Sequence, residues 1–335
     1  MCVQRQETGG CFSELGPDRV LNLAERALKI SCTNLFRPLN SYINRVFEVE
    51  GPDKTGFVVK FYRPGRWSRD AILEEHRFLL ELAARELPVV PPLLLENGET
   101  LAEDNGIYFG IFPKCGGRSV DEFSDGEWLQ LGRLLGRVHQ VGEMVDARYR
   151  IRMLPRKSTL SQLDFLMASR CVPEDLKPAL QKTVLSIVDD IVPIFKETEI
   201  IRIHGDCHFA NVIKRPGESL FLIDFDDMAM GPPVQDIWML LPGDIENSFI
   251  ELELFLEGYE TFRSFDRRTL CLLEPLRAMR FIHYMAWCAH QVEDDGLTRA
   301  VDGFGSRDYW QKEINDLLDQ RSRIAAPHQL SGNIL

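Results

Sequence analysis

The spacing of hydrophobic and polar positions changes along the chain and divides it into two regions. In the first region, helical spacing is seen at residues 17–30 and again behind Ser68, a residue type that often caps helices. Patterns of apolar and polar residues that are typical of strands lie at 39–50, 56–62 and 107–112. These patterns predict a small strand-rich lobe over residues 1–112.

The second region is mainly helical in its spacing. Helices are expected at 125–142, 174–196, 246–262, 267–291 and 308–322, with one β interruption at 201–226. The stretch Pro113-Lys114-Cys115-Gly116-Gly117 between the two regions is typical of a hinge, which we place at 113–118. The sequence therefore predicts an α+β, bilobal protein, with a larger helical lobe over residues 119–335.

Composition narrows the class of protein without naming a function. The chain has 335 residues, of which 44% are hydrophobic and 27% charged, as in ordinary globular proteins. Its net charge of −12 argues against a nucleic-acid partner, and no apolar run is long enough to span a membrane. Eight scattered cysteines without a C-x-x-C pair, and no signal-peptide pattern, favour a cytoplasmic location.

One motif carries most of the chemical information. The string HGDCHFAN places Asn211 five residues after Asp206, and Asp224 follows thirteen residues after Asn211, at the end of an apolar run. Protein kinases use this arrangement, in which one carboxylate orients the attacking hydroxyl and two oxygen ligands hold Mg²⁺ on the ATP phosphates. We therefore expect ATP as co-substrate, Asp206 and Asp224 as catalytic residues, Asn211 and Asp224 as Mg²⁺ ligands, and a protein kinase-like fold.

A lysine and a glutamate are expected to complete the nucleotide site. Lys60 lies in the strand pattern VVKF and resembles the kinase lysine that contacts phosphates and pairs with a helix glutamate. Two glutamates on the next helix are candidates. Glu75 has apolar residues at +3, +4 and +7 and borders the buried face, whereas Glu74 is turned by about 100°. We expect Glu75 to be the partner of Lys60.

Other candidates rest on position alone. Ser41 and Asn44 lie where protein kinases carry a glycine-rich loop, and their side chains are candidates for covering phosphates. Phe112, the last strand residue before the expected hinge, is a further candidate for nucleotide binding. Asp226 has two open roles, to assist the metal or to accept hydrogen bonds from its loop. Residues 274–288 form an apolar stripe at helical spacing, for which core packing is the main interpretation and the wall of a substrate groove is the alternative.

The strings LNSYINRV, FVVKFYRPGRW, ILEEHRF, FPKCGGR, HGDCHFAN, DFDDMAMGP, VQDIWMLL and EPLRAMR together resemble the bacterial stress response kinase A family. That family consists of serine/threonine protein kinases within the aminoglycoside phosphotransferase-like superfamily, and the resemblance runs from about Pro38 to Trp310. It implies a monomeric kinase that depends on ATP and Mg²⁺, autophosphorylates and acts on protein Ser/Thr in the stress response.

Two other functions stay open at this point. The motif fits equally well a small-molecule kinase that acts on homoserine, choline or an aminoglycoside. A scaffold that only binds nucleotide is the third possibility, although all three motif residues, Asp206, Asn211 and Asp224, are present.

Overall fold

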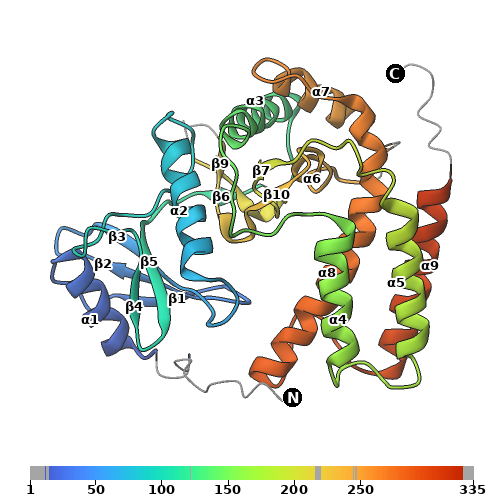
Figure 1. Ribbon diagram of the computed structural model, residues 1–335. Coiled ribbons are helices and arrows are strands. Elements are labelled where there is room, and N and C mark those ends of the chain that lie inside the picture. Colours follow the sequence, from blue (N-terminus) through green and yellow to red (C-terminus); the bar gives the residue numbers. More distant parts are fainter. Residues whose placement is uncertain are drawn as a thin grey trace. The chain divides into compact units, whose positions relative to one another are not determined.

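The structure is a computed structural model that describes residues 12, 15–120, 122–215, 220–243, 245 and 247–326. They fall into two compact units. The first unit lies within Met1–Arg150, His208–Met228 and Glu253–Phe262, and the second within Ile151–Cys207, Ala229–Leu252 and Arg263–Leu335. An N-terminal antiparallel sheet and a helical C-terminal part confirm the predicted α+β class (Figure 1). The predicted lobes and hinge stay a prediction.

A five-stranded antiparallel sheet forms the centre of the first unit. Its strands are β1 (Phe36–Leu39), β2 (Arg45–Glu50), β3 (Gly56–Phe61), β4 (Ala102–Asp104) and β5 (Ile107–Pro113). They are ordered β1-β2-β3-β5-β4. Lys60 in β3 is paired with Val46 of β2 and with Gly110 of β5, so it sits in the middle of the sheet.

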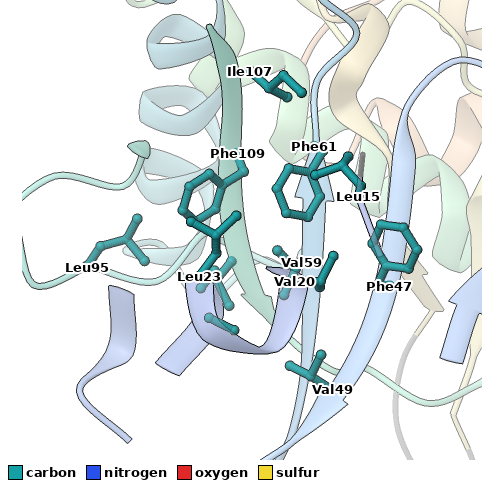
Figure 2. Close-up of a cluster of buried hydrophobic side chains, with 12 residues drawn as sticks. Leu15, Val20, Leu23, Phe47, Val49, Val59, Phe61, Leu95, Ile107 and Phe109 are labelled. Atoms are coloured by element: carbon teal, nitrogen blue, oxygen red, sulfur yellow. The ribbon is translucent and has the colours of Figure 1, made fainter. Parts of the chain in front are cut away.

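Helix α1 (Pro17–Leu28) covers one face of this sheet (Figure 2). Its buried residues Val20 and Leu23 pack against alternate strand residues, among them Phe47, Val59 and Phe61. Strand side chains alternate between faces, so Lys60 points away from this core. Burial of each large apolar side chain stabilises the fold by about 1.5–3 kcal/mol.

Helix α2 (Arg69–Ala83) lies on the opposite face, where Ile72 packs against Tyr62. The predicted cap is confirmed, because the Ser68 hydroxyl accepts a hydrogen bond from the Ala71 N–H. Buried positions along α2 include Glu74 and Glu75 as well as the apolar residues. The helix therefore brings carboxylates onto the lysine side of the sheet.

A small three-stranded sheet lies between Asn211 and Asp224, the two expected metal ligands. It consists of β6 (Arg118–Ser119), β8 (Val212–Lys214) and β9 (Leu220–Leu222), in the order β6-β8-β9. Helix α3 (Asp125–Gly142) has the predicted bounds. It packs very closely on residues 253–259 of α7 (Phe249–Tyr259), because a Cβ atom at Gly132 would lie 2.0 Å from the Phe255 carbonyl oxygen.

The second unit is mostly helical. Its helices are α4 (Leu160–Ala168), α5 (Lys177–Ile191), α6 (Val234–Trp238), α8 (Leu273–Asp295) and α9 (Arg307–Ala325). Strands β7 (Ile201–Ile203) and β10 (Ala229–Gly231) form an antiparallel pair. The four longer helices α4, α5, α8 and α9 pack side by side in Figure 1. No helix in the described part of the chain is long and apolar enough to cross a membrane.

Some predicted elements differ from the structure in their bounds. The single strand predicted at 39–50 is two strands, because residues 40–44 form a loop between β1 and β2. The helix predicted at 267–291 begins as a 3-10 turn, Arg267–Leu272, and continues as α8. Helix α4 was not predicted. Its nine residues follow a π-turn, Pro155–Thr159, and are too few for a clear periodic signal.

Candidate active site

Lys60 lies among three carboxylates of the first unit. Its Nζ is 3.1 Å from Asp226 Oδ1, 3.3 Å from Glu75 Oε1 and 3.4 Å from Asp224 Oδ1. The predicted pairing with Glu75 rather than Glu74 is confirmed, since Glu74 accepts the backbone N–H groups of residues 148 and 149 instead. Strand β3, helix α2 and the segment after β9 therefore meet at one lysine.

Two of these carboxylates, Asp226 and Glu75, differ in the direction of their pKa shift. Burial lowers the pKa of Lys60, but Asp226, Glu75 and Asp224 outweigh it and hold this pKa well above its ordinary value. Burial also raises the pKa of Asp226, yet Lys60, Arg66 and Arg150 reverse the effect and bring it far below the usual range. Burial raises the pKa of Glu75, and Lys60 offsets this only in part. Of Asp226 and Glu75, Asp226 is thus the more firmly ionised partner of Lys60.

Two arginines fix the segment that follows Asp224. Arg66 Nη1 lies 2.6 Å from Asp226 Oδ2, and its Nη2 lies 2.6 Å from Asp227 Oδ1. Arg150 is buried, donates to the backbone carbonyls of Asp226 and Met228, and stacks on Trp67. Both partners of the Asp226 carboxylate, Lys60 and Arg66, lie outside its own loop, so the two roles left open for Asp226 stay predictions.

The β8–β9 hairpin brings the two expected metal ligands to one end. Val212 of β8 is paired with Leu222 of β9, and one residue further the Asn211 carbonyl accepts the N–H of Ile223 at 3.0 Å. Asp224 follows directly. Its backbone is left-handed, with φ +60°, which is a strained conformation for a residue other than glycine.

Asn211 and Asp224 fit the chemistry of a magnesium site. An amide oxygen and a carboxylate are hard oxygen donors, the type that Mg²⁺ prefers. Asn211 is buried, whereas the Asp224 side chain is 58% exposed and open to a ligand from solvent. Strained backbone that is retained at such a position is typical of residues with a functional role.

The remaining nucleotide candidates have structural contacts of their own. Asn44 is buried, and its Oδ1 accepts the N–H of Arg63 at 3.1 Å, so it ties the loop at 40–44 to the end of β3. Ser41 is half-buried in that loop. Phe112 is buried in β5, where its ring meets His76 edge-on. Nucleotide contacts by Ser41, Asn44 and Phe112 stay predictions.

Asp206 belongs to the second unit, in the turn that follows β7. Gly205 has φ +85°, a left-handed conformation that favours glycine, so the turn explains the glycine of the motif. The Asp236 carboxylate accepts the N–H groups of His204 and Gly205, at 2.7 and 2.8 Å. Arg280 Nη2 lies 2.6 Å from Asp206 Oδ1. Helices α6 and α8 thus hold the backbone and the carboxylate of this turn.

Sequence reasoning did not find several of these residues. Arg66 and Arg150 received no role, and Arg280 was considered only as part of the stripe at 274–288. The place of Asp236 in the pattern VQDIWMLL predicts only that it stabilises the start of a helix. Asp236 does lie in the first turn of α6, but it is fully buried and binds backbone of the Asp206 turn. An aspartate directly before an apolar string, IWMLL, was the signal available.

Comparison with known proteins agrees with this arrangement. Residues 36–273 match the phosphotransferase enzyme family. Stress response kinase A of Escherichia coli K12 is 36% identical over 325 residues, which cover 94% of this chain and 95% of the relative. The serine/threonine protein kinase RdoA of Salmonella typhimurium is 37% identical over the same shares.

The chain is a member of the phosphotransferase enzyme family. Within it, the chain belongs with the stress response kinase A proteins, and it is therefore a phosphotransferase of the kinase type. The match to this family contains every site residue named from the sequence, from Ser41 to Asp224. Arg280 lies beyond its last matched residue.

Solved structures agree with the kinase-like fold of this phosphotransferase. Amicoumacin kinase in complex with AMP-PNP and Ca²⁺ has a TM-score of 0.72 at 20% identity, covering 93% of this chain and 94% of its own. The microcompartment-associated aminopropanol kinase has a TM-score of 0.67 at 17% identity, over 92% and 96%. At these identities the likeness shows the fold alone.

Proposed function

We propose that this phosphotransferase is an ATP- and Mg²⁺-dependent serine/threonine protein kinase of the stress response, acting in the cytoplasm as a monomer. The proposal rests on one observation above others, the 36% identity to stress response kinase A over nearly the whole of both chains. The intact motif residues Asp206, Asn211 and Asp224 support it. Autophosphorylation is part of the same proposal.

Each motif residue has a role that its chemistry allows. Asn211 and Asp224 would hold Mg²⁺, which neutralises phosphate charge when bound. Lys60, raised in pKa and kept in place by Glu75, stays cationic at neutral pH and is suited to contact nucleotide phosphates. Asp206 orients the hydroxyl of the substrate. Because Lys60 already lies beside Asp224 and Asp226, these carboxylates keep the Lys60 ammonium group in position before a nucleotide binds.

A small-molecule kinase is the second candidate. It is favoured by the names of the solved structures with this fold, which include kinases of amicoumacin and aminopropanol and a spectinomycin phosphotransferase. Their low identity to this chain, 13–20%, supports the fold rather than the substrate. The relatives at 36–37% identity therefore weigh more heavily.

Labelled ATP separates the two candidates. The purified chain is incubated with γ-labelled ATP and Mg²⁺, once with a generic basic protein and once with homoserine, choline or an aminoglycoside. The proposal predicts label on the basic protein and on the chain itself. Saturable turnover of one small alcohol, with no label on protein, would move the chain to the second candidate. Asp206→Asn is the control for contaminating kinases.

A further inference from the structure

The backbone of the turn that carries Asp206 is held by helix α6 of the same unit. Asp236 accepts the N–H groups of His204 and Gly205, and Gln235 Nε2 donates to the Gly205 carbonyl at 3.3 Å. These contacts fix where the Asp206 side chain leaves the backbone. They do not set its torsions, which decide where the two carboxylate oxygens point.

Arg280 of α8 contacts the carboxylate itself. The distance from its Nη2 to Asp206 Oδ1 is 2.6 Å, which is short for a charge-assisted hydrogen bond. The two side chains are 28% and 19% exposed, so solvent screens the pair only in part. A planar, permanently charged guanidinium is well suited to hold a carboxylate in one orientation.

Arg280 projects from a rigid part of the fold. Its neighbours Ala278, Met279 and Ile282 are buried, so the middle of the 23-residue helix α8 is fixed by packing. Six residues before it, Glu274 is held by Gln320 of α9 at 2.6 Å. The position of the guanidinium is therefore set by the core of the unit rather than by a loop.

We propose that Arg280 is a positioning residue, which holds the Asp206 carboxylate in the orientation that receives the substrate hydroxyl and acts on phosphoryl transfer through Asp206. This inference rests on the proposed function of Asp206. The contact matters for the rate because a misplacement of about 1 Å can slow a reaction on the order of 100-fold. Arg280 lies outside residues 36–273, where the family match ends.

The test compares variants at matched ion pairs. Arg280→Gln removes the positive charge, whereas Arg280→Lys keeps the charge on an ammonium group that lacks the planar geometry of the guanidinium. Arg321→Gln is the control, because Arg321 Nε makes a 2.6 Å contact with Asp190 in the same unit, between α9 and α5. We expect kcat to fall on the order of 10- to 100-fold in Arg280→Gln and to recover in part in Arg280→Lys. In the control variant kcat should not change. The KM for ATP should stay within about twofold.

A double-mutant cycle with Asp206→Asn decides whether Arg280 acts through Asp206. If it does, Arg280→Gln should lower the residual rate of the Asp206→Asn enzyme by less than about threefold. An equal loss in both backgrounds, or an unchanged kcat in the wild-type background, would overturn the inference. If Arg280→Gln does not fold, the cycle is run with Arg280→Lys. A wild-type chain that transfers no phosphate would instead overturn the proposed function.

Discussion

Asp224 and Asp226 are two residues apart, and the structure predicts opposite consequences when each is replaced by asparagine. Asp226 is buried and lies beside Lys60 and Arg66, at 3.1 and 2.6 Å. Asp224 is 58% exposed and approaches Lys60 only at 3.4 Å. We expect Asp226→Asn to lower the stability of the fold and Asp224→Asn to lower the activity while the fold stays intact.

The size of the stability loss follows from the ion pairs. Removing one partner of a buried pair costs about 3–5 kcal/mol, because the other charge stays buried without compensation. In the Asp226→Asn variant Lys60 still has Glu75 as an ion-pair partner, and Arg66 still has Asp227. We therefore expect a smaller loss of stability, about 2–4 kcal/mol. For a unit of this size that corresponds to roughly 5–15 °C in unfolding temperature. Asp224→Asn should change stability by less than about 1 kcal/mol, since the Asp224 carboxylate is 58% exposed and asparagine tolerates a left-handed backbone.

The assay is thermal unfolding of the nucleotide-free protein, with Asp227→Asn as the matched control. Asp227 binds the same arginine at the same 2.6 Å but is more exposed, so its loss should be smaller. The pH dependence has a definite sign. Because the folded pKa of Asp226 is depressed, its contribution is complete above the unfolded pKa of about 4 and is lost as pH falls through the folded value. An Asp226→Asn protein within about 1 kcal/mol of wild type would refute this account.

Three further predictions follow from single residues. Asp206→Asn should lower phosphoryl transfer on the order of 100-fold or more with an unchanged unfolding temperature, and a near-wild-type rate would remove Asp206 from the mechanism. Burial, with Lys60 and Arg150 nearby, lowers the pKa of His76 to about 3, so stability should fall by up to roughly 1.4 kcal/mol per pH unit below about 6.5. Denaturant titrations of His76→Gln should lose this slope, and an equal slope would assign it to other groups. Gly132→Ala should destabilise the chain by about 3 kcal/mol or more, because the new Cβ meets the Phe255 carbonyl; unchanged unfolding would contradict this close packing.

The parts of the fold that could be predicted are those with a local signal. Helix α3 has the predicted bounds because its capping box, Ser124 with Glu127, and its apolar spacing agree on the same start. Ser68 marks the start of α2 in the same way. The loop at 40–44 was absorbed into a strand because it contains Tyr42 and Ile43, residue types that are common in strands, and only pairing with β3 shows where β2 begins.

The site residues likewise differ in whether the sequence carries a local signal for them. The motif spacing names Asp206, Asn211 and Asp224 as candidates, and helical periodicity correctly predicts Glu75 rather than Glu74 as the partner of Lys60. The roles of the arginines could not be predicted from the sequence, because their partners are far away along the chain. Arg66 and Asp226 are 160 residues apart, and Arg280 and Asp206 are 74 apart. Nothing local distinguishes such an arginine from a solvated surface residue.

The chemical identity of the phosphorylated atom tests the central claim most directly. The chain is incubated with γ-labelled ATP and Mg²⁺, with a generic basic protein present, and the labelled protein is hydrolysed for phosphoamino-acid analysis. The account predicts phosphoserine or phosphothreonine from both proteins, and neither with Asp206→Asn. Label that appears only on a small alcohol such as homoserine, choline or an aminoglycoside, with none on serine or threonine, would contradict it.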